Sequence, residues 1–524
     1  MLVRKNISHK KQLKICPKYR YLHIILCIII SIIFSVSFFI FHWDLRIIFY
    51  LMRFLYSIDH YSFCPPLSKK SISTFLIISF LIKLLDIRKK IVYTFSNKTK
   101  KGFEMNQETL ALHYGYDKQQ FGTMSVPVYQ TTAYDFGSAE TAANRFALKE
   151  LGPIYTRLNN PTTDVLEARI AAVENGEAAI ATASGQAAIF FAIANLAEAG
   201  DNIIVAKKIY GGATTLLTHT IKRFGIKAKV FDSDSADDLE ALIDEKTKAI
   251  FFETLSNPQI AIPNIEKIVE VAKKYNIITV ADNTVATPIL FQPLNHGIDV
   301  SVHSASKYIS GQGSAIGGLV VEAKGLNAKL IGNPRYPQFN EPDESYHGLV
   351  YATLPFPIFS LRIRLSLIRD IGATIAPFNS WLLIQGLETL SLRVKEHSRN
   401  AYKVASFLKS HPKVKKVSYP GLESDPLHAR AKQYFKDAQT SGLLSFEVED
   451  FEFAKHILNS TKIFSVVVNI GDSKSIITHP ASTTHQQLSA DELEKAGVKA
   501  GLIRLSIGLE NADDLIEDLK IALG

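Results

Sequence analysis

The sequence predicts an α/β protein with a large, mostly parallel sheet domain and a smaller C-terminal α+β domain. From residue 105 onward, short apolar runs alternate with amphipathic helical stretches. The apolar runs are nearly uninterrupted, as in strands that are buried on both faces. Glycine and polar residues follow them directly, and ligands of such sheets bind beyond the carboxyl ends of the strands. We expect strands at 178–183, 202–206, 228–231, 249–253, 277–281, 300–303, 317–321 and 502–507, and helices at 237–243, 265–275 and 381–408.

Residues 1–104 differ in composition from the rest of the chain. They hold 18 Lys and Arg against 4 Asp and Glu, no alanine, and one of the 28 glycines. They also hold all three cysteines, Cys16, Cys27 and Cys64. The remainder has a net charge of −5, so nothing in it indicates nucleic-acid binding. Without cysteine, it has no disulfide framework and no thiolate metal site, and we expect no metal and a cytoplasmic protein.

Two interpretations of residues 1–104 stay open. Residues 22–43 are apolar, carry no formal charge and follow seven basic residues, which fits a membrane anchor with a cytoplasmic N-terminus. Alternatively, the segment is translated AT-rich DNA, because it is rich in Ile, Lys, Phe and Tyr and lacks Ala. The run Lys100-Lys101-Gly102 can be encoded by purines of a ribosome-binding site just before Met105. We expect translation to begin at Met105.

Lys307 is the strongest candidate for a reactive residue. It follows an apolar run in Ser304-Ala305-Ser306-Lys307-Tyr308 and precedes Gly311-Gln312-Gly313. A lysine amine that is partly removed from water becomes nucleophilic and can condense with an aldehyde. The hydroxyls of Ser304 and Ser306 are near enough to bind phosphate oxygens.

Two further motifs fit the same chemistry. Asp282 ends an apolar run, where a carboxylate can pair with a protonated pyridine nitrogen. Ser184-Gly185-Gln186 lies between a strand and a helix, so its amides can bind phosphate at the helix N-terminus. Alone, Asp282 is more often a helix cap. The glycines of 311–317 do not have dinucleotide-binding spacing, which excludes a nicotinamide site.

Together these residues resemble the Cys/Met-metabolism family of pyridoxal-phosphate enzymes. The resemblance covers residues 105–524, and it implies the aspartate-aminotransferase-like fold (fold type I) with pyridoxal 5'-phosphate on Lys307 and Asp282 at the ring nitrogen. Ser306 stands where many relatives have Thr, so the hydroxyl is kept.

The resemblance also implies roles for residues whose types alone are unspecific. Tyr155 and Arg157 would reach the cofactor phosphate of a neighbouring subunit, since an arginine fork binds phosphate oxygens. Tyr210 would stack on the ring, and Asn257 would lie near its hydroxyl. Arg504, inside an apolar strand, would bind the substrate carboxylate, and Asn469 would lie in the substrate site. Lys307 would be the catalytic residue that moves protons, with Tyr155 or Tyr210 assisting.

Within the family, the chain is most similar to the O-acetylhomoserine sulfhydrylases. The features concerned are Gln186, the runs 469–472 and 479–485, the additional segment 333–351, and Gly212 where methionine γ-lyases carry Cys. This implies replacement of acetate at Cγ by sulfide or a thiol, giving homocysteine or methionine. A cystathionine γ-synthase or γ-lyase activity is the alternative within the family. A membrane-tethered scaffold without catalysis is the alternative of another class.

The resemblance divides the chain into four regions. Residues 1–104 form the basic hydrophobic segment, and 105–165 an N-terminal arm that contacts a neighbouring subunit. Residues 166–375 form the large cofactor-binding domain, and 376–524 the C-terminal domain. The cross-subunit role of Tyr155 and Arg157 requires a homo-oligomer, and we expect a dimer of dimers.

The start at Met105 can be checked by intact-mass analysis of the protein from its natural host. We expect a species that lacks residues 1–104, because the basic, alanine-free composition is confined to the residues before Met105, the predicted start of translation. A mass that includes the residues from Met1 would contradict the expectation.

Overall fold

The computed structural model describes residues 105–118, 122–483, 486 and 498–524. The predicted membrane span at 22–43, like the rest of residues 1–104, lies outside the described residues. In the described part of the chain, no helix has both the length and the apolar character that a membrane crossing needs.

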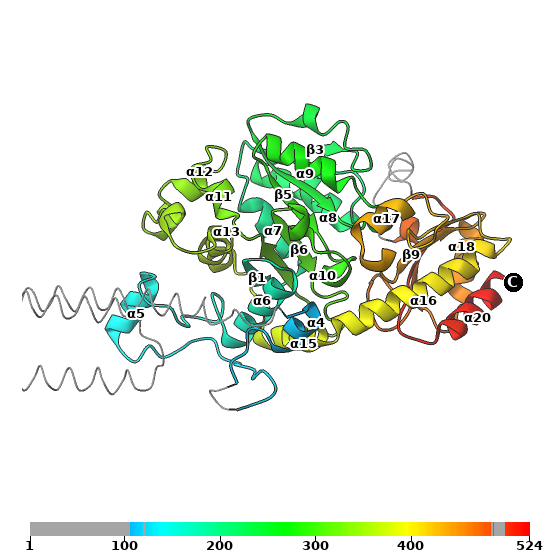
Figure 1. The fold of residues 1–524 in the computed structure, drawn as a ribbon, viewed down its shortest axis with the longest axis horizontal. Helices are drawn as coiled ribbons and strands as arrows, with labels where there is room; N and C mark the ends of the chain where they lie inside the picture. Colours follow the sequence, from blue (N-terminus) through cyan, green and yellow to red (C-terminus); the bar gives the residue numbers. More distant parts are fainter. Residues whose placement is uncertain (1–104, 119–121, 484–485, 487–497) are drawn as a thin grey trace, which may run out of the picture. The chain divides into compact units, whose positions relative to one another are not determined.

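The larger part of the described chain is built around a seven-stranded sheet with helices packed against it (Figure 1). Its strand order is β1-β7-β6-β5-β4-β2-β3. The pairs β3–β2, β2–β4, β4–β5 and β5–β6 are parallel, whereas β7 is antiparallel to both β1 and β6. The strands are β1 (Ala178–Thr182), β2 (Asn202–Ala206), β3 (Lys227–Phe231), β4 (Thr247–Glu253), β5 (Ile278–Asp282), β6 (Val300–Ser304) and β7 (Gly318–Glu322).

Helices cover the sheet, and their sequences explain where they begin. Asn160 caps the first turn of α6 by accepting a hydrogen bond from the Thr162 amide, and Pro161 occupies the first helical position. The α9 helix buries Ile265, Ile268 and Ala272, one face of the helix, against the sheet core. The helices here are α4 (Gln107–His113), α5 (Ala139–Phe146), α6 (Pro161–Val173), α7 (Gly185–Ala194), α8 (Gly211–Thr218), α9 (Ile265–Lys274), α10 (Thr287–Leu290), α11 (Asn327–Leu330), α12 (Pro337–Asn340), α13 (Ile358–Arg362) and α14 (Arg369–Ile371).

A smaller five-stranded sheet follows, with the order β10-β11-β12-β9-β8. Its apolar core includes Phe446, Ile503 and Leu519, which α18 and α20 help to enclose. The elements are β8 (Lys416–Ser418), α17 (His428–Tyr434), β9 (Leu443–Glu447), α18 (Phe451–Ser460), β10 (Ser465–Val466), β11 (Ile476–Thr478), β12 (Leu502–Ser506) and α20 (Ala512–Leu523).

Two predicted helices differ from the structure. The helix expected at 381–408 is two helices, α15 (Pro377–Glu388) and α16 (Leu390–Ser410). The Arg393 guanidinium donates to the Gly386 carbonyl at 2.6 Å, so a side chain satisfies a carbonyl at the end of α15. The helix expected at 237–243 is only a 3₁₀ turn, Glu240–Leu242.

The α16 helix runs from the larger sheet to the smaller one (Figure 1). It carries a strip of buried polar side chains. Arg393 donates to the carbonyls of Tyr308 and Ile309 at 2.6 and 3.1 Å. His397 donates from Nδ1 to the Ile507 carbonyl at 2.6 Å, and Asn400 donates to the Gly508 carbonyl at 3.2 Å. One helix face therefore holds both the turn after Lys307 and the end of β12.

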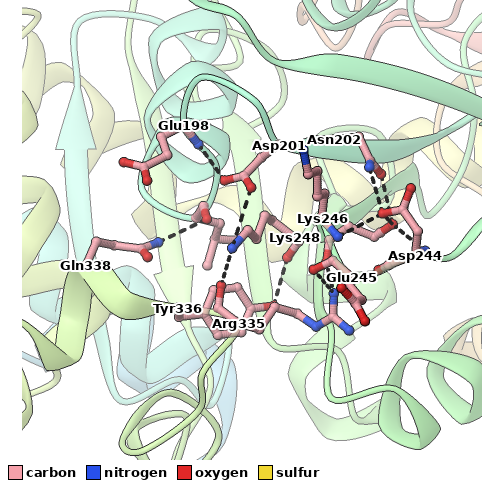
Figure 2. A network of polar contacts seen from close by, with 12 residues as sticks. Glu198, Asp201, Asn202, Asp244, Glu245, Lys246, Lys248, Arg335, Tyr336 and Gln338 are labelled. Carbon is pink, nitrogen blue, oxygen red and sulfur yellow. Dashed lines mark hydrogen bonds and ion pairs between the residues drawn. The ribbon is translucent and has the colours of Figure 1, made fainter.

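The segment 333–351 was noted in the sequence as an additional segment. It is anchored at the amino ends of β4 and β5 (Figure 2). Arg335 Nη1 donates to the carbonyls of residues 244, 245 and 247 at 3.0, 3.0 and 2.6 Å. The buried Tyr336 hydroxyl donates to the Lys248 carbonyl and accepts from the Ile278 amide, both at 2.8 Å. The hydroxyl thus joins the segment to β4 and β5.

The Tyr336→Phe substitution tests this anchor. It removes one oxygen and leaves a buried amide and a buried carbonyl without their partner, so we expect the free energy of unfolding to fall by about 2 kcal/mol. Denaturant unfolding followed by circular dichroism measures the change. The matched control is Tyr402→Phe, on the exposed face of α16, which should change stability by less than about 0.5 kcal/mol. Equal effects of the two substitutions would contradict the anchor.

Candidate active site

Lys307 lies three residues beyond the end of β6, in a turn that Arg393 holds from α16. Its Nζ donates to Asn469 Oδ1 at 2.7 Å. Burial and the neighbouring charge of Arg504 lower the pKa of the Lys307 amine from its usual value. A larger fraction of the amine is therefore neutral and nucleophilic than in a lysine exposed to water.

Arg504 lies in the middle of β12 and is 2 % exposed. Its guanidinium donates to Asn257 Oδ1 at 3.0 Å, to the Asn469 carbonyl at 2.9 Å and to Thr478 Oγ1 at 3.3 Å. All three acceptors are neutral, and Nε is buried without a hydrogen-bond partner among the described residues. Burial lowers the pKa of Arg504 to about 10, so the group remains a cation at neutral pH. A buried cation with neutral partners is suited to bind an anion.

Asp282 is the last residue of β5, and its carboxylate accepts a hydrogen bond from the Thr284 amide at 2.9 Å. Burial raises the pKa of Asp282, while hydrogen bonds from Thr284 and the charge of His303 oppose the rise. His303 itself is paired with Glu174, Nε2 to Oε2 at 2.7 Å, in the sheet interior. Asp282 thus stands at the carboxyl edge of the sheet, one strand from the end of β6 that precedes Lys307.

The first turn of α7 packs against the end of β6. Ser184 caps the helix by accepting from the Ala187 amide at 3.2 Å. A Cβ atom on Gly185 would lie 2.6 Å from Ser304 Cβ and 2.8 Å from its Cα, so only glycine permits this approach. Ser306 has a different position: its hydroxyl donates to the Gly317 carbonyl at 3.2 Å and accepts from the Gly317 amide at 3.0 Å. The predicted phosphate ligands at 184, 185 and 304 therefore lie together, and the Ser306 hydroxyl is engaged with the backbone.

Tyr210 and Gln186 are linked through Gly212. Gln186 Nε2 donates to the Gly212 carbonyl at 2.9 Å. A Cβ atom on Gly212 would lie 2.5 Å from Tyr210 Cε1, so a side chain there would displace the tyrosine ring. Two residues on which the subgroup resemblance depends are thus in contact beside Tyr210.

Tyr155 and Arg157 lie shortly before α6 and are exposed. The guanidinium of Arg157 lies over the Tyr155 ring, 5.4 Å from its centroid. In the described part of this chain, neither side chain hydrogen-bonds to Lys307, Asp282 or Arg504. The structure of one chain therefore does not bring this pair to the other predicted site residues.

No cluster of His, Cys, Asp and Glu among the described residues is arranged to hold a metal ion.

The family model of the Cys/Met metabolism PLP-dependent enzymes matches residues 108–524. The chain belongs to this family.

Relatives of the family agree with the resemblance. The chain is 45 % identical over 427 residues to an O-acetyl-L-homoserine sulfhydrylase of Leptospira meyeri, covering 79 % of this chain and 96 % of the relative. It is 42 % identical to O-acetyl-L-homoserine sulfhydrylase 1 of Thermus thermophilus, covering 80 % and 100 %. Among solved structures, it is similar to a Campylobacter jejuni protein assigned as an O-acetylhomoserine (thiol)-lyase, with 58 % identity, a TM-score of 0.79, and 80 % and 100 % coverage. The predicted fold class is confirmed, and so is the family.

The cofactor of this family is pyridoxal phosphate, and the residues present fit it. The structure of the Campylobacter jejuni protein contains N'-pyridoxyl-lysine-5'-monophosphate. In this chain, Lys307 has a lowered pKa, Asp282 is a carboxylate at a strand end, and the Gly185 backbone approaches Ser304 more closely than a side chain would permit. These groups match the aldehyde, the ring nitrogen and the phosphate of the cofactor.

The sequence did not point to two residues of the site. Glu253 lies at the end of β4 and is 5 % exposed. Its carboxyl oxygens accept hydrogen bonds from the backbone amides of Tyr210 and Asn257. Arg393 holds the turn after Lys307. A glutamate that ends an apolar strand in 249–253 was the available signal for the first. Nothing in the helical pattern around Arg393 distinguishes it from a surface arginine.

Gly185→Ala tests the fit at the α7 N-terminus. The added Cβ would force Ser304 and the helix apart, so we expect the dissociation constant of pyridoxal phosphate to rise about tenfold, or roughly 1.4 kcal/mol. Titration of the apoprotein with the cofactor, followed by visible absorbance, measures it. An unchanged dissociation constant would mean that the phosphate binds elsewhere.

Proposed function

We propose that the protein is a transferase that replaces acetate at Cγ of O-acetylhomoserine by sulfide or a small thiol. The observation that supports this most directly is the buried guanidinium of Arg504, whose hydrogen-bond partners among the described residues are all neutral and which lies beside Lys307. An α-carboxylate would give Arg504 its missing counter-charge and place the α-carbon of an amino acid near Lys307.

Substrate binding, proton transfer and cofactor binding are assigned to different residues of the chain. Arg504 and Asn469 bind the substrate, and Asn257 orients Arg504 through its amide oxygen. Lys307 takes the α-proton on Nζ, moves a proton off the β-carbon and back onto it, and finally returns a proton to the α-carbon; its lowered pKa favours the proton removals. Asp282 would hold the protonated ring nitrogen of the cofactor, which would supply the sink for the electrons of the α-carbon.

The overall exchange is balanced. The Cγ–O bond breaks and acetate leaves with its electron pair, while a bond forms between Cγ and the sulfur of HS⁻, giving homocysteine. No oxidant or reductant is needed. The names of the Leptospira meyeri and Thermus thermophilus relatives support the acetyl substrate and the sulfur donor.

We also propose a cytoplasmic homo-oligomer, a dimer of dimers. Tyr155 and Arg157 are exposed in the single chain and make no hydrogen bond there to the site residues described above. A neighbouring subunit would bring such a pair to a cofactor phosphate, which needs cationic ligands. In this arrangement Arg157 binds phosphate, and the Tyr155 hydroxyl assists proton transfer.

A substrate panel tests the proposed function. The protein with bound cofactor is incubated with sulfide and, in turn, O-acetylhomoserine, O-succinylhomoserine, O-acetylserine and cystathionine. We expect sulfide-dependent acetate release and homocysteine from the first compound, at a kcat/KM at least about tenfold above the others. The control is Lys307→Ala, which removes the group that carries the cofactor and should abolish turnover and the visible absorbance of the lysine-bound cofactor.

Other outcomes assign other activities. Preference for O-succinylhomoserine, or breakdown of cystathionine, would indicate a cystathionine enzyme. Cofactor binding without turnover of any of the compounds would favour a scaffold.

A further inference from the structure

Glu253 is a buried carboxyl group at the site with no role in the proposed reaction. It ends β4 and pairs in register with Asp282, which ends β5. Paired residues of neighbouring parallel strands point to the same face of a sheet, so the two carboxyl groups stand side by side at the carboxyl edge. Glu253 is 5 % exposed, and its position is therefore set by protein contacts rather than by water.

Both oxygens of Glu253 accept hydrogen bonds from backbone amides of the loops that frame the site. Oε1 accepts from the Tyr210 amide at 2.7 Å, and Oε2 accepts from the Asn257 amide at 3.1 Å. Tyr210 is the residue directly before α8, in the loop after β2, whereas Asn257 belongs to the loop after β4. One side chain thus joins the loops that follow two adjacent strands of the sheet, β2 and β4.

The contact continues to the proposed carboxylate-binding residue. Asn257 Oδ1 accepts from Arg504 Nη1 at 3.0 Å. A shift of the Asn257 backbone would therefore move an acceptor of a buried guanidinium, which has few others.

We propose that Glu253 is a positioning residue that fixes Tyr210 against the cofactor ring and, through Asn257, fixes Arg504 for the substrate carboxylate. The inference rests on the proposed roles of Tyr210 and Arg504. Burial and the negative charge of Asp282 both raise the pKa of Glu253 well above its usual value.

The test compares Glu253→Gln with Glu322→Gln, each in the full chain with bound cofactor. Glutamine keeps the volume of Glu253 but offers one acceptor oxygen in place of two, so one of the two amides loses its bond. Glu322 is a matched control because it is also buried, at 1 % exposure, and accepts a hydrogen bond from the Ser360 amide at 2.6 Å. It lies at the opposite end of the strands, where it pairs with Val300 at the start of β6.

Two readouts separate positioning from a general loss of stability. The first is the induced circular dichroism of the bound cofactor together with its dissociation constant, which report ring orientation and affinity. The second is the division of any activity loss between KM and kcat for the amino-acid substrate. For Glu253→Gln we expect a changed dichroism band, a dissociation constant raised about fivefold to tenfold and a KM raised by a similar factor. Glu322→Gln should leave all three within about twofold of the unsubstituted protein.

Thermal unfolding of both variants completes the comparison. If Glu253→Gln matches Glu322→Gln in dichroism, cofactor affinity and KM, the inference is overturned. If both variants lose cofactor affinity in proportion to their loss of stability, Glu253 is a structural residue and the inference is likewise overturned. The dichroism and affinity measurements need only pyridoxal phosphate, so a failure of the proposed reaction in the substrate panel would be recognised separately.

Discussion

The polar strip of α16 is the constraint on which the geometry of the site depends. Lys307 follows a strand of the larger sheet, and Arg504 lies in a strand of the smaller one. Arg393 binds the carbonyls just after Lys307, and His397, one helical turn further, binds the carbonyl just after β12. Because residues four apart lie on the same helix face, the helix fixes the distance between the Lys307 amine and the Arg504 guanidinium. Burial lowers the pKa of His397 to about 4, so this contact is made by a neutral imidazole at any pH near neutrality.

Burial explains why the pKa values of the acidic and basic groups of the site are shifted in opposite directions. Two carboxyl groups, Asp282 and Glu253, end neighbouring strands, and burial raises the pKa of both. Lys307 and Arg504 are the basic groups of the site, and burial lowers the pKa of both. The protein thus holds groups whose charged forms are costly until a ligand of complementary charge arrives. A cofactor with a protonated ring nitrogen and a substrate with a carboxylate supply those charges.

The sequence predicted those parts of the fold that depend on local pattern. The strands of the larger sheet appear where short apolar runs were found, because strands buried on both faces are mostly apolar. The antiparallel direction of β7, between β1 and β6, has no such local signal. The break between α15 and α16 depends on a bond from Arg393 to Gly386 and on the turn after Lys307, which approaches α15 from far along the chain. For the site, family motifs led to Lys307, Asp282 and Arg504, whereas Glu253 is identified only by its contacts with Tyr210 and Asn257.

The contact between Gln186 and Gly212 gives a physical meaning to a difference within the family. Gln186 fixes the Gly212 carbonyl, and the absence of a side chain at Gly212 leaves the space that the Tyr210 ring occupies. The amide of Tyr210 is held from the other side by Glu253. A larger residue at position 212 would therefore require the ring to tilt against a fixed backbone, and the ring is the surface against which we propose that the cofactor lies. The identity of residue 212 and the orientation of Tyr210 are thus coupled by packing, and a change at one cannot be accommodated without a change at the other.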